Sequence, residues 1–348
     1  NARSFMRVIR RLCLNVRFPR GDTIMQYRRL GQSGLQLSAL SYGAWVTFGN
    51  QLGRGEAREL IAQCLDTGVN FFDNAETYAN GEAERIMGDV LVDLRVPRDA
   101  FCVSSKVFFG AVDDPKPTQR GLSHKHIRDA CDQALARLRV DYLDLYFCHR
   151  HDPEVPVAEV VTTMDLLIRQ GKVLYWGTSE WSAEQIREAI AFAQAHGLFA
   201  PQMEQPQYNL LHRARFESEL VPLAREHGLG TTVWSPLASG LLSGKYADGV
   251  PADSRLNTPG YEWLRARLLS RRDELSAGLA RFAALAREIG SSQSTLALAW
   301  CLNKPQVSTV MLGATKRGQL DENFAALALA ERLDTDLMAR IESCFPLI

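Results

Sequence analysis

The stretch VNFFDNAETYANGEAE, residues 69–84, contains an apolar run that stops at Asp73, five residues before Tyr78. A second apolar run, FCVSSK (residues 101–106), stops at Lys106. Neither run alternates apolar with polar residues, which is typical of parallel strands covered on both faces. The stretch therefore predicts two parallel strands, one ending on an acid and the next on a base.

Similar apolar runs recur along the chain, and helix-like segments separate them. We predict eight strands, over residues 37–43, 69–75, 101–107, 141–149, 173–180, 201–208, 230–237 and 308–314. Eight strand–helix units over roughly 300 residues predict an α/β fold of the (β/α)8 TIM-barrel type. The alternative, a doubly wound sheet, would be expected to carry a GxGxxG after its first strand, and the sequence has none there.

Helix signals lie between the predicted strands. In ARELIAQCLDTG (57–68) the apolar residues share one face. Ser123 is placed to cap a helix that runs to residue 138. Ser182 and Gln185 have the spacing of a capping box, and Gly197 follows the same segment as an expected C-terminal stop.

Two insertions interrupt the strand–helix rhythm, at residues 108–121 and 238–290. Both follow the ends of predicted strands, so we expect both on the catalytic face of the barrel. The longer insertion is expected to clamp a bound cofactor and slow its release. The tail, residues 319–345, predicts two helices packed outside the barrel.

The composition excludes several classes of protein. The 348 residues carry 40 basic and 40 acidic side chains, without the basic surplus usual in nucleic-acid binders. No apolar run reaches the ~18–20 residues of a membrane span. The seven cysteines form no CxxC pair and no zinc spacing. We therefore predict buried thiols, no metal site and a cytoplasmic protein.

The first 24 residues differ from the rest of the chain, because they hold six arginines and a single acid, Asp22. Such a start is found in transit peptides. The interpretation that we prefer is a leader or added extension without fixed structure, with a natural start near Met25. We expect residues 25–348 to form a single domain.

In a barrel, the carboxyl ends of all strands lie on one rim. Four ionisable residues follow three successive predicted strands, namely Asp73, Tyr78, Lys106 and His149. Taken singly, each has a more ordinary explanation: a helix cap, a packed tyrosine, a solvated lysine or a structural histidine. Their conjunction on one rim favours a catalytic cluster.

Such a cluster suits the reduction of a carbonyl, because hydride addition leaves an alkoxide that needs a proton. A tyrosine hydroxyl can donate it. A lysine cation about 4 Å away stabilises the resulting phenolate by ~4 kcal/mol at an effective dielectric of ~20. The lysine needs a carboxylate to stay charged, and His149 can hydrogen-bond the carbonyl oxygen. We predict Tyr78 as the general acid.

The segment FDNAETYANGEAERIMG (72–88) resembles the signature of the aldo-keto reductases, and SSK (104–106) resembles that family's strand-three lysine. The chain is similar, more closely, to the reductases related to voltage-gated potassium channel β-subunits. The matching stretches begin YRRLGQSG (27–34) and end GATKRGQLDEN (313–323), with VDYLDLYFCHRHDPEVP (140–156) and WSPLASGLLSGKY (234–246) between. The resemblance implies a tetrad of Asp73, Tyr78, Lys106 and His149, and a homotetramer.

The resemblance also implies that NADP(H) lies across the rim without a Rossmann motif. Around the nicotinamide it places Ala44, Trp45, Gln51, Asp73, Ser179, Gln205 and Trp234. Along the pyrophosphate it places Ser235, Pro236, Leu237, Ala238, Ser239, Lys245 and Arg255, with backbone N–H groups as donors. At the adenosine end it places Gly313, Thr315, Gln319, Glu322 and Asn323. Candidate walls of a pocket for a small carbonyl substrate, or alternatively barrel packing, are Trp45, Phe48, Phe108, Trp176 and Trp181.

Three positions distinguish this chain from the channel β-subunits. His149 stands where they carry asparagine, which favours turnover over a purely regulatory role. Glu180 replaces their arginine, and Asp253 replaces a lid tyrosine, which weakens the expectation of a strong preference for NADP. Two alternatives remain: a module that senses NADP(H) and regulates a membrane channel with little turnover, and a metal hydrolase, which the unclustered histidines disfavour.

Overall fold

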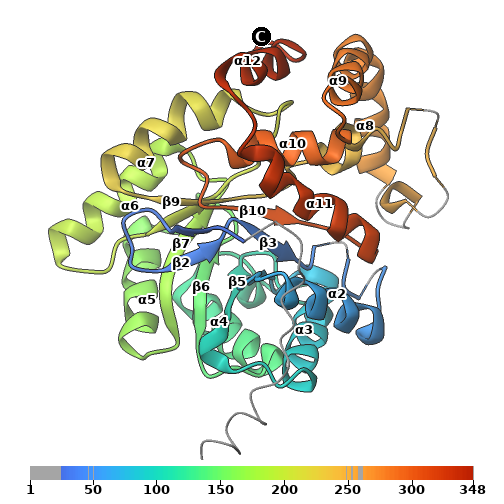
Figure 1. Cartoon of the computed structure of the whole chain (residues 1–348). Coiled ribbons are helices and arrows are strands. Elements are labelled where there is room, and N and C mark those ends of the chain that lie inside the picture. Colours follow the sequence, from blue (N-terminus) through green and yellow to red (C-terminus); the bar gives the residue numbers. More distant parts are fainter. Residues whose placement is uncertain are drawn as a thin grey trace, which may run out of the picture.

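A computed structural model of the chain describes residues 25–45, 47–49, 51–247, 249–251, 254–257 and 262–347. Within them, eight parallel strands close a barrel in the order β10-β3-β4-β5-β6-β7-β8-β9. Figure 1 shows the strands in the middle of the molecule, with helices around them. The strands are β3 (Leu40–Gly43), β4 (Phe71–Asp73), β5 (Cys102–Val107), β6 (Leu143–Cys148), β7 (Val173–Ser179), β8 (Met203–Gln205), β9 (Gly230–Val233) and β10 (Thr309–Leu312). The predicted TIM barrel is confirmed, and each predicted strand overlaps an observed one.

The first predicted strand, 37–43, is two strands. The chain breaks at Ala39, so that β2 (Gln36–Ser38) pairs antiparallel with β1 (Tyr27–Arg29), and only β3 joins the barrel. Leu30 and Leu37 of this hairpin pack in one cluster with side chains from five barrel strands. Because those strands surround the barrel axis, the hairpin closes its amino-terminal end.

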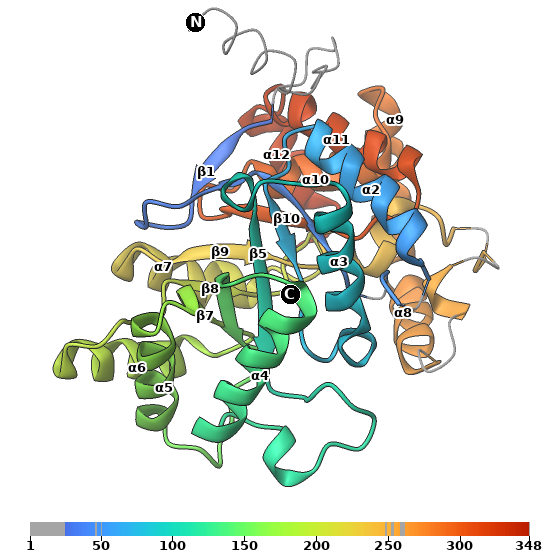
Figure 2. The ribbon, with the colours of Figure 1, turned by 90° about the horizontal axis from the view of Figure 1, so that it is seen from below.

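Helices cover the barrel on the outside (Figure 2). The ring consists of α2 (Arg54–Asp66), α3 (Glu82–Asp93), α4 (His124–Leu138), α5 (Val157–Arg169), α6 (Ala183–His196), α7 (Val221–His227), α10 (Gln293–Leu302) and α11 (Arg317–Ala330). The expected caps are present: Ser123 accepts from the N–H of His126, and Ser182 and Gln185 form a capping box. Gly197 ends α6 at a φ of 65°.

The longer insertion is partly helical, with α8 (Glu262–Glu274) and α9 (Ser276–Glu288) in its second half. The tail forms the two predicted helices, but the first of them, α11, is a ring helix, because it follows β10 and packs between α10 and α2. The second, α12 (Thr335–Ser343), lies outside the ring. The rings of Phe282 and Phe345 join the chain after it to α9, with centroids 5.7 Å apart.

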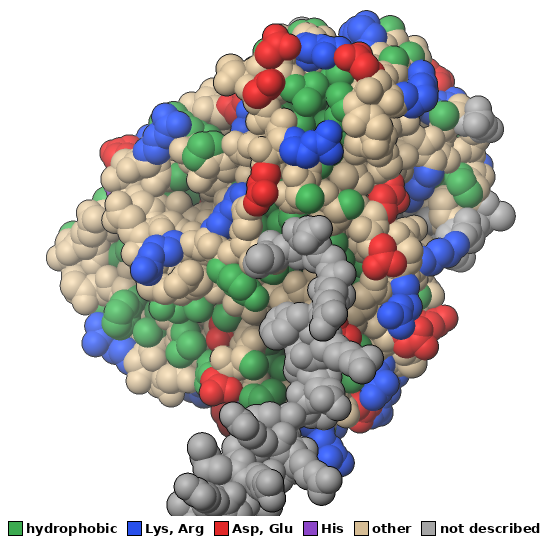
Figure 3. Space-filling model, in the orientation of Figure 1, with side chains coloured by type: hydrophobic (Ala, Val, Ile, Leu, Met, Phe, Trp, Pro, Cys, Tyr) green, Lys and Arg blue, Asp and Glu red, His purple; other side chains and the backbone are tan. Residues whose placement is uncertain are grey.

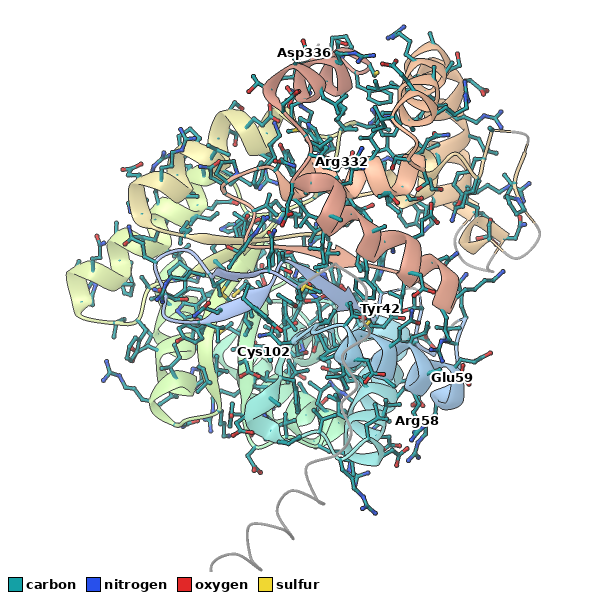
Figure 4. All side chains as sticks on the ribbon, in the orientation of Figure 1. Tyr42, Arg58, Glu59, Cys102, Arg332 and Asp336 are labelled. Atoms are coloured by element: carbon teal, nitrogen blue, oxygen red, sulfur yellow. The ribbon has the colours of Figure 1, made fainter. Side chains whose placement is uncertain are left out.

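The interior is mostly apolar, with some buried polar and charged side chains, and the surface is mixed in charge. Tyr42 and Cys102, labelled in Figure 4, are buried, while Arg58 and Glu59 on α2 are exposed. Six cysteines, 64, 102, 131, 148, 301 and 344, are free and buried; Cys13 and the rest of 1–24 lie outside the described residues. Basic and acidic side chains alternate over the face in Figure 3. In the described part of the chain, no helix is long and apolar enough to cross a membrane.

Close packing of α3 against α4 depends on Gly88. A Cβ there would lie 2.5 Å from the carbonyl oxygen of Leu138, whereas one on Gly55 in α2 would meet nothing within 4 Å. We predict that Gly88→Ala lowers the free energy of unfolding by about 1–3 kcal/mol through overpacking. The control Gly55→Ala raises it by about 0.5–1 kcal/mol, because alanine favours a helix. Urea unfolding measures both; stabilisation by both variants would contradict the close approach.

Candidate active site

The barrel brings the four predicted residues together at its carboxyl-terminal end. Asp73 ends β4, Lys106 lies near the end of β5, and His149 directly follows β6. Tyr78 begins a short turn, Tyr78–Gly81, after β4. Because β4, β5 and β6 are neighbours in the barrel, their ends present these side chains to one another.

Lys106 is the centre of the cluster, and its side chain is fully buried. Its Nζ donates to Asp73 Oδ2 over 2.6 Å, to the carbonyl of Asn74 over 2.7 Å and to the Tyr78 hydroxyl over 3.2 Å. Burial lowers the pKa of Lys106, and the Asp73 carboxylate opposes that shift. The ammonium thus has three acceptors, one of them the expected proton donor.

Asp73 is held from both sides of the barrel. Its Oδ1 accepts from the Ser104 hydroxyl over 2.7 Å and from Gln205 Nε2 over 3.0 Å. With Oδ2 on Lys106, both carboxylate oxygens have partners. Fixed in this way, Asp73 cannot turn away from Lys106, and the lysine keeps one position.

His149 completes the group as a neutral side chain. Burial, together with the charges of Lys106 and Arg150, holds the pKa of His149 well below its usual range. Its ring lies edge-on to Tyr78, with centroids 6.0 Å apart. Its Nδ1 is buried without a hydrogen-bond partner. A neutral imidazole beside a tyrosine hydroxyl can orient a carbonyl oxygen without competing for the lysine's counter-ion.

The cluster opens into a cavity of about 520 Å³. Asp73, Tyr78 and His149 line it, and Lys106 lies behind them. Most of the residues expected around a cofactor also line it: Trp45, Ser179, Gln205, Trp234, Ser235, Pro236, Leu237, Ser239, Lys245, Gly313, Gln319, Glu322 and Asn323. Among the described residues, no group of three or more His, Cys, Asp or Glu side chains is placed to hold a metal ion.

Comparison with known proteins decides the family. The model of the Aldo/keto reductase family matches residues 39–345. The chain belongs to this family.

Three relatives are similar over almost the whole chain. A rice (Oryza sativa subsp. japonica) protein named "Probable voltage-gated potassium channel subunit beta" is 49% identical, over 92% of this chain and 96% of its own length. An Arabidopsis thaliana protein of the same name is 46% identical, over 91% and 96%. A Schizosaccharomyces pombe protein named "Putative voltage-gated potassium channel subunit beta" is 43% identical, over 91% and 92%. The resemblance to the channel β-subunit-like reductases is thereby confirmed.

Members of the aldo/keto reductase family generally bind NADP(H), and the cavity fits such a group. The cluster around Lys106 and α11, which carries Gln319, Glu322 and Asn323, both contribute to its wall. Ser179 and Gln205 line it beside Asp73, with the Ser179 hydroxyl donating to the Gln205 carbonyl over 2.9 Å. One cavity therefore spans the residues expected to be catalytic and the residues expected at the far end of a dinucleotide.

In the turn expected to hold the pyrophosphate, several backbone N–H groups already have acceptors within the turn. Ser235, Ala238 and Ser239 have positive φ angles. The N–H groups of Ala238, Ser239 and Gly240 all donate within the turn, over 2.8–3.0 Å. These backbone donors are therefore in use, and Lys245, which lines the cavity, supplies positive charge there.

Four of the residues expected near a cofactor do not line the cavity: Ala44, Gln51, Ala238 and Thr315. Thr315 instead donates to Gln319 Oε1 through its N–H, over 2.8 Å, at the start of α11. The side chain of Arg255 and all of Asp253 lie outside the described residues. Of the predicted pocket walls, only Trp45 lines the cavity; Phe48, Phe108, Trp176 and Trp181 serve as barrel packing.

Sequence reasoning missed several cavity residues, among them Thr77, Phe109, Arg150, Ser243, Ser294 and Met311. Phe109 and Arg150 each lie one position beyond a predicted site residue. No pattern in the sequence tells which of two neighbouring side chains at a strand end will face the cavity.

Glu180 has a partner set that the sequence did not indicate. Its Oε1 accepts from Trp234 Nε1 over 2.9 Å, and its Oε2 pairs with Arg215 over 2.9 Å. Glu180 itself has a φ of 60°. Glu180 thus fixes the indole of Trp234, a wall of the cavity.

The neutral state of His149 predicts a pH dependence of stability. The unfolded chain takes up a proton on this residue below about pH 6.5, whereas the native site excludes it. Because the native pKa is lowered, this stabilising contribution is present above pH 6.5 and is lost as the pH falls. From pH 7.5 to 5.5, wild type is expected to lose about 1.4 kcal/mol relative to His149→Asn.

Urea unfolding at both pH values measures that difference. The pKa of His126 is shifted oppositely: burial, the largest single cause, lowers it, but the hydrogen bond and negative charge of Glu76, together with the Gly121 carbonyl and the charge of Asp129, raise it overall. His126 is present in both proteins, so its contribution cancels. A constant difference, or one that grows in favour of wild type at low pH, would contradict a buried neutral His149.

Proposed function

We propose that this protein reduces aldehydes or ketones to alcohols with NADPH, and that Tyr78 delivers the proton. One observation carries the proposal: Lys106 Nζ bonds both Asp73 and the Tyr78 hydroxyl at the wall of a cavity. A tyrosine that faces a cavity and contacts a buried cation is arranged to lose a proton. Packing alone requires neither feature.

When bound, NADPH supplies a hydride to the carbonyl carbon, and the carbonyl electron pair moves to oxygen. His149 hydrogen-bonds that oxygen and fixes its approach. Tyr78 then transfers its hydroxyl proton to the oxygen, which completes the alcohol. Lys106 stabilises the phenolate left behind by an amount on the order of a few kcal/mol. Asp73 keeps the lysine charged throughout, and solvent restores the proton to Tyr78.

The residues that line the cavity can be assigned to three parts of an extended cofactor: the nicotinamide, the pyrophosphate and the adenosine end. We assign Ser179, Gln205 and Trp234 to the nicotinamide, beside the catalytic cluster. Lys245 is assigned to the pyrophosphate, because it is the cation beside the turn that follows β9. Gln319 and Asn323 are assigned to the adenosine end. Glu322 is also part of the cavity wall there. Its negative charge would repel the 2′-phosphate that distinguishes NADP from NAD, which limits any preference for NADP.

A second candidate function follows from the names of the relatives. Three proteins that are 43–49% identical are named as potassium channel β-subunits. In this alternative, the barrel binds NADP(H) and regulates a membrane channel with little turnover. His149, which the resemblance places where channel β-subunits carry asparagine, favours the reductase.

Turnover separates the two functions. We predict that wild type consumes NADPH, followed by its absorbance, with members of a panel of aldehydes. Tyr78→Phe is expected to lose roughly 10²-fold or more in kcat/KM, because the proton donor is removed while the ring stays. Tyr27→Phe is the matched control, since Tyr27 is half-exposed and its hydroxyl bonds the carbonyl of Gly68 far from the cavity.

The outcomes are distinct. Equal rates for wild type and Tyr78→Phe would remove Tyr78 as the acid. If both proteins bind NADPH and neither consumes it with any aldehyde, the reductase proposal fails, and the cofactor-sensing subunit becomes the better account.

A further inference from the structure

We propose that Arg150 selects carbonyl substrates that carry a carboxylate. The inference rests on the proposed reductase function and names its substrate class. Arg150 directly follows His149 at the end of β6, and it lines the cavity together with Thr77, Tyr78 and Phe109. An arginine in the wall beside the proton donor is placed to contact the substrate.

The position of β6 separates Arg150 from the adenosine end of the cavity. In the closed barrel, β6 and β10 stand opposite each other, with three strands between them on either path. Gly313 and Asn323 belong to the segment after β10. We therefore assign the phosphates of the dinucleotide to Lys245. Arg150 lies at the end of the cavity that holds Tyr78.

Arg150 has donors to spare. One of its nitrogens donates to the carbonyl of His149 and so orients the guanidinium. Within the described residues, it forms no ion pair with any carboxylate. An arginine carries five N–H donors in a fork that matches a carboxylate with two parallel hydrogen bonds. A half-buried guanidinium without an acid partner is a site for an anion.

The charged residues near Arg150 also favour an anion at this site. Asp73, the acid at this end of the cavity, is neutralised by Lys106 at 2.6 Å. The positive charge of Arg150 contributes to lowering the pKa of both Lys106 and His149, so its field reaches the catalytic cluster. An anionic substrate group would offset that field, whereas a second cation would add to it.

Phe109 supplies an apolar wall next to the cation. The guanidinium carbon of Arg150 lies 5.7 Å from the centre of the Phe109 ring, and the His149 ring lies 5.1 Å from it. Glu76 Oε1 fixes the loop that carries Phe109, since it accepts from the N–H groups of Phe108 and Gly110 over 2.8 and 2.9 Å. Phe109 is 41% exposed.

An apolar face beside an unpaired cation fits one kind of molecule. The substrate would have an aromatic or aliphatic body that contacts Phe109, a carboxylate on Arg150 and an aldehyde or ketone at Tyr78. A simple neutral aldehyde would use the catalytic cluster without using Arg150.

Two matched aldehydes test the inference. kcat/KM is measured with 4-carboxybenzaldehyde and with its neutral ester, methyl 4-formylbenzoate. We expect Arg150→Met to lower the acid-to-ester ratio of kcat/KM by about 10–100-fold, the effect of losing a charged hydrogen-bonding partner. Arg150→Lys, which keeps the charge and loses the fork, should fall in between. Arg58→Met, an exposed arginine on α2, is the control and keeps the wild-type ratio.

Salt gives a second readout that a merely structural role would not move. Raising the NaCl concentration should raise KM for the acid in wild type and leave KM for the ester unchanged, because screening acts on the charged pair. An acid-to-ester ratio that is the same in wild type and Arg150→Met would overturn the inference. So would an equal effect of salt on both substrates.

Failure of the reductase proposal is distinguishable. If wild type consumes NADPH with neither of these aldehydes nor any other of the panel, that proposal fails, and calorimetric titration with benzoate tests the anion site on its own. A loss of benzoate affinity of tenfold or more in Arg150→Met, with Arg58→Met unchanged, supports it. Equal affinity in all three proteins overturns it.

Discussion

The burial of one positive charge organises this protein. Lys106 is fully enclosed, and a buried ammonium costs several kcal/mol unless acceptors surround it. Asp73 meets that need only because Gln205 and Ser104 hold it in turn. The bond from Asp73 to Gln205 joins β4 to β8, which stand opposite each other in the closed barrel. The charged state of Lys106 therefore depends on closure of the barrel. The readiness of the Tyr78 hydroxyl to lose its proton depends in turn on that charge.

The two ends of the barrel differ: one is closed and the other opens into a cavity. At the amino-terminal end, the β1–β2 hairpin packs Leu30 and Leu37 into the interior and closes it. At the carboxyl-terminal end, the loops leave a cavity of about 520 Å³. The same low-dielectric interior that makes Lys106 costly makes its effect on a neighbouring hydroxyl strong. It also keeps His149 neutral, so that two basic side chains of one cluster, Lys106 and His149, hold different charges.

Features that depend on strand ends were predictable from the sequence, whereas features that depend on side-chain direction were not. Asp73, Lys106 and His149 were found because each stops an apolar run, and a barrel collects such ends on one rim. The β1–β2 hairpin was missed because residues 37–43 form one continuous run in the sequence. Phe109 and Arg150 were missed because their neighbours, Phe108 and His149, carry equally plausible chemistry. The contacts of Glu180 with Trp234 and Arg215 were missed because the partners are 54 and 35 residues away in the sequence.

The most direct test of this account is a single turnover with Lys106→Met. Enzyme loaded with NADPH is mixed with excess 4-nitrobenzaldehyde, and the loss of bound NADPH is followed in wild type and in the variant. NADPH binding, measured first by fluorescence, shows that the variant is folded. The account predicts that Lys106→Met still binds NADPH and that its rate constant for oxidation of the cofactor falls by about 10²-fold or more. A rate constant within about threefold of wild type would contradict a buried lysine that prepares Tyr78 for proton transfer.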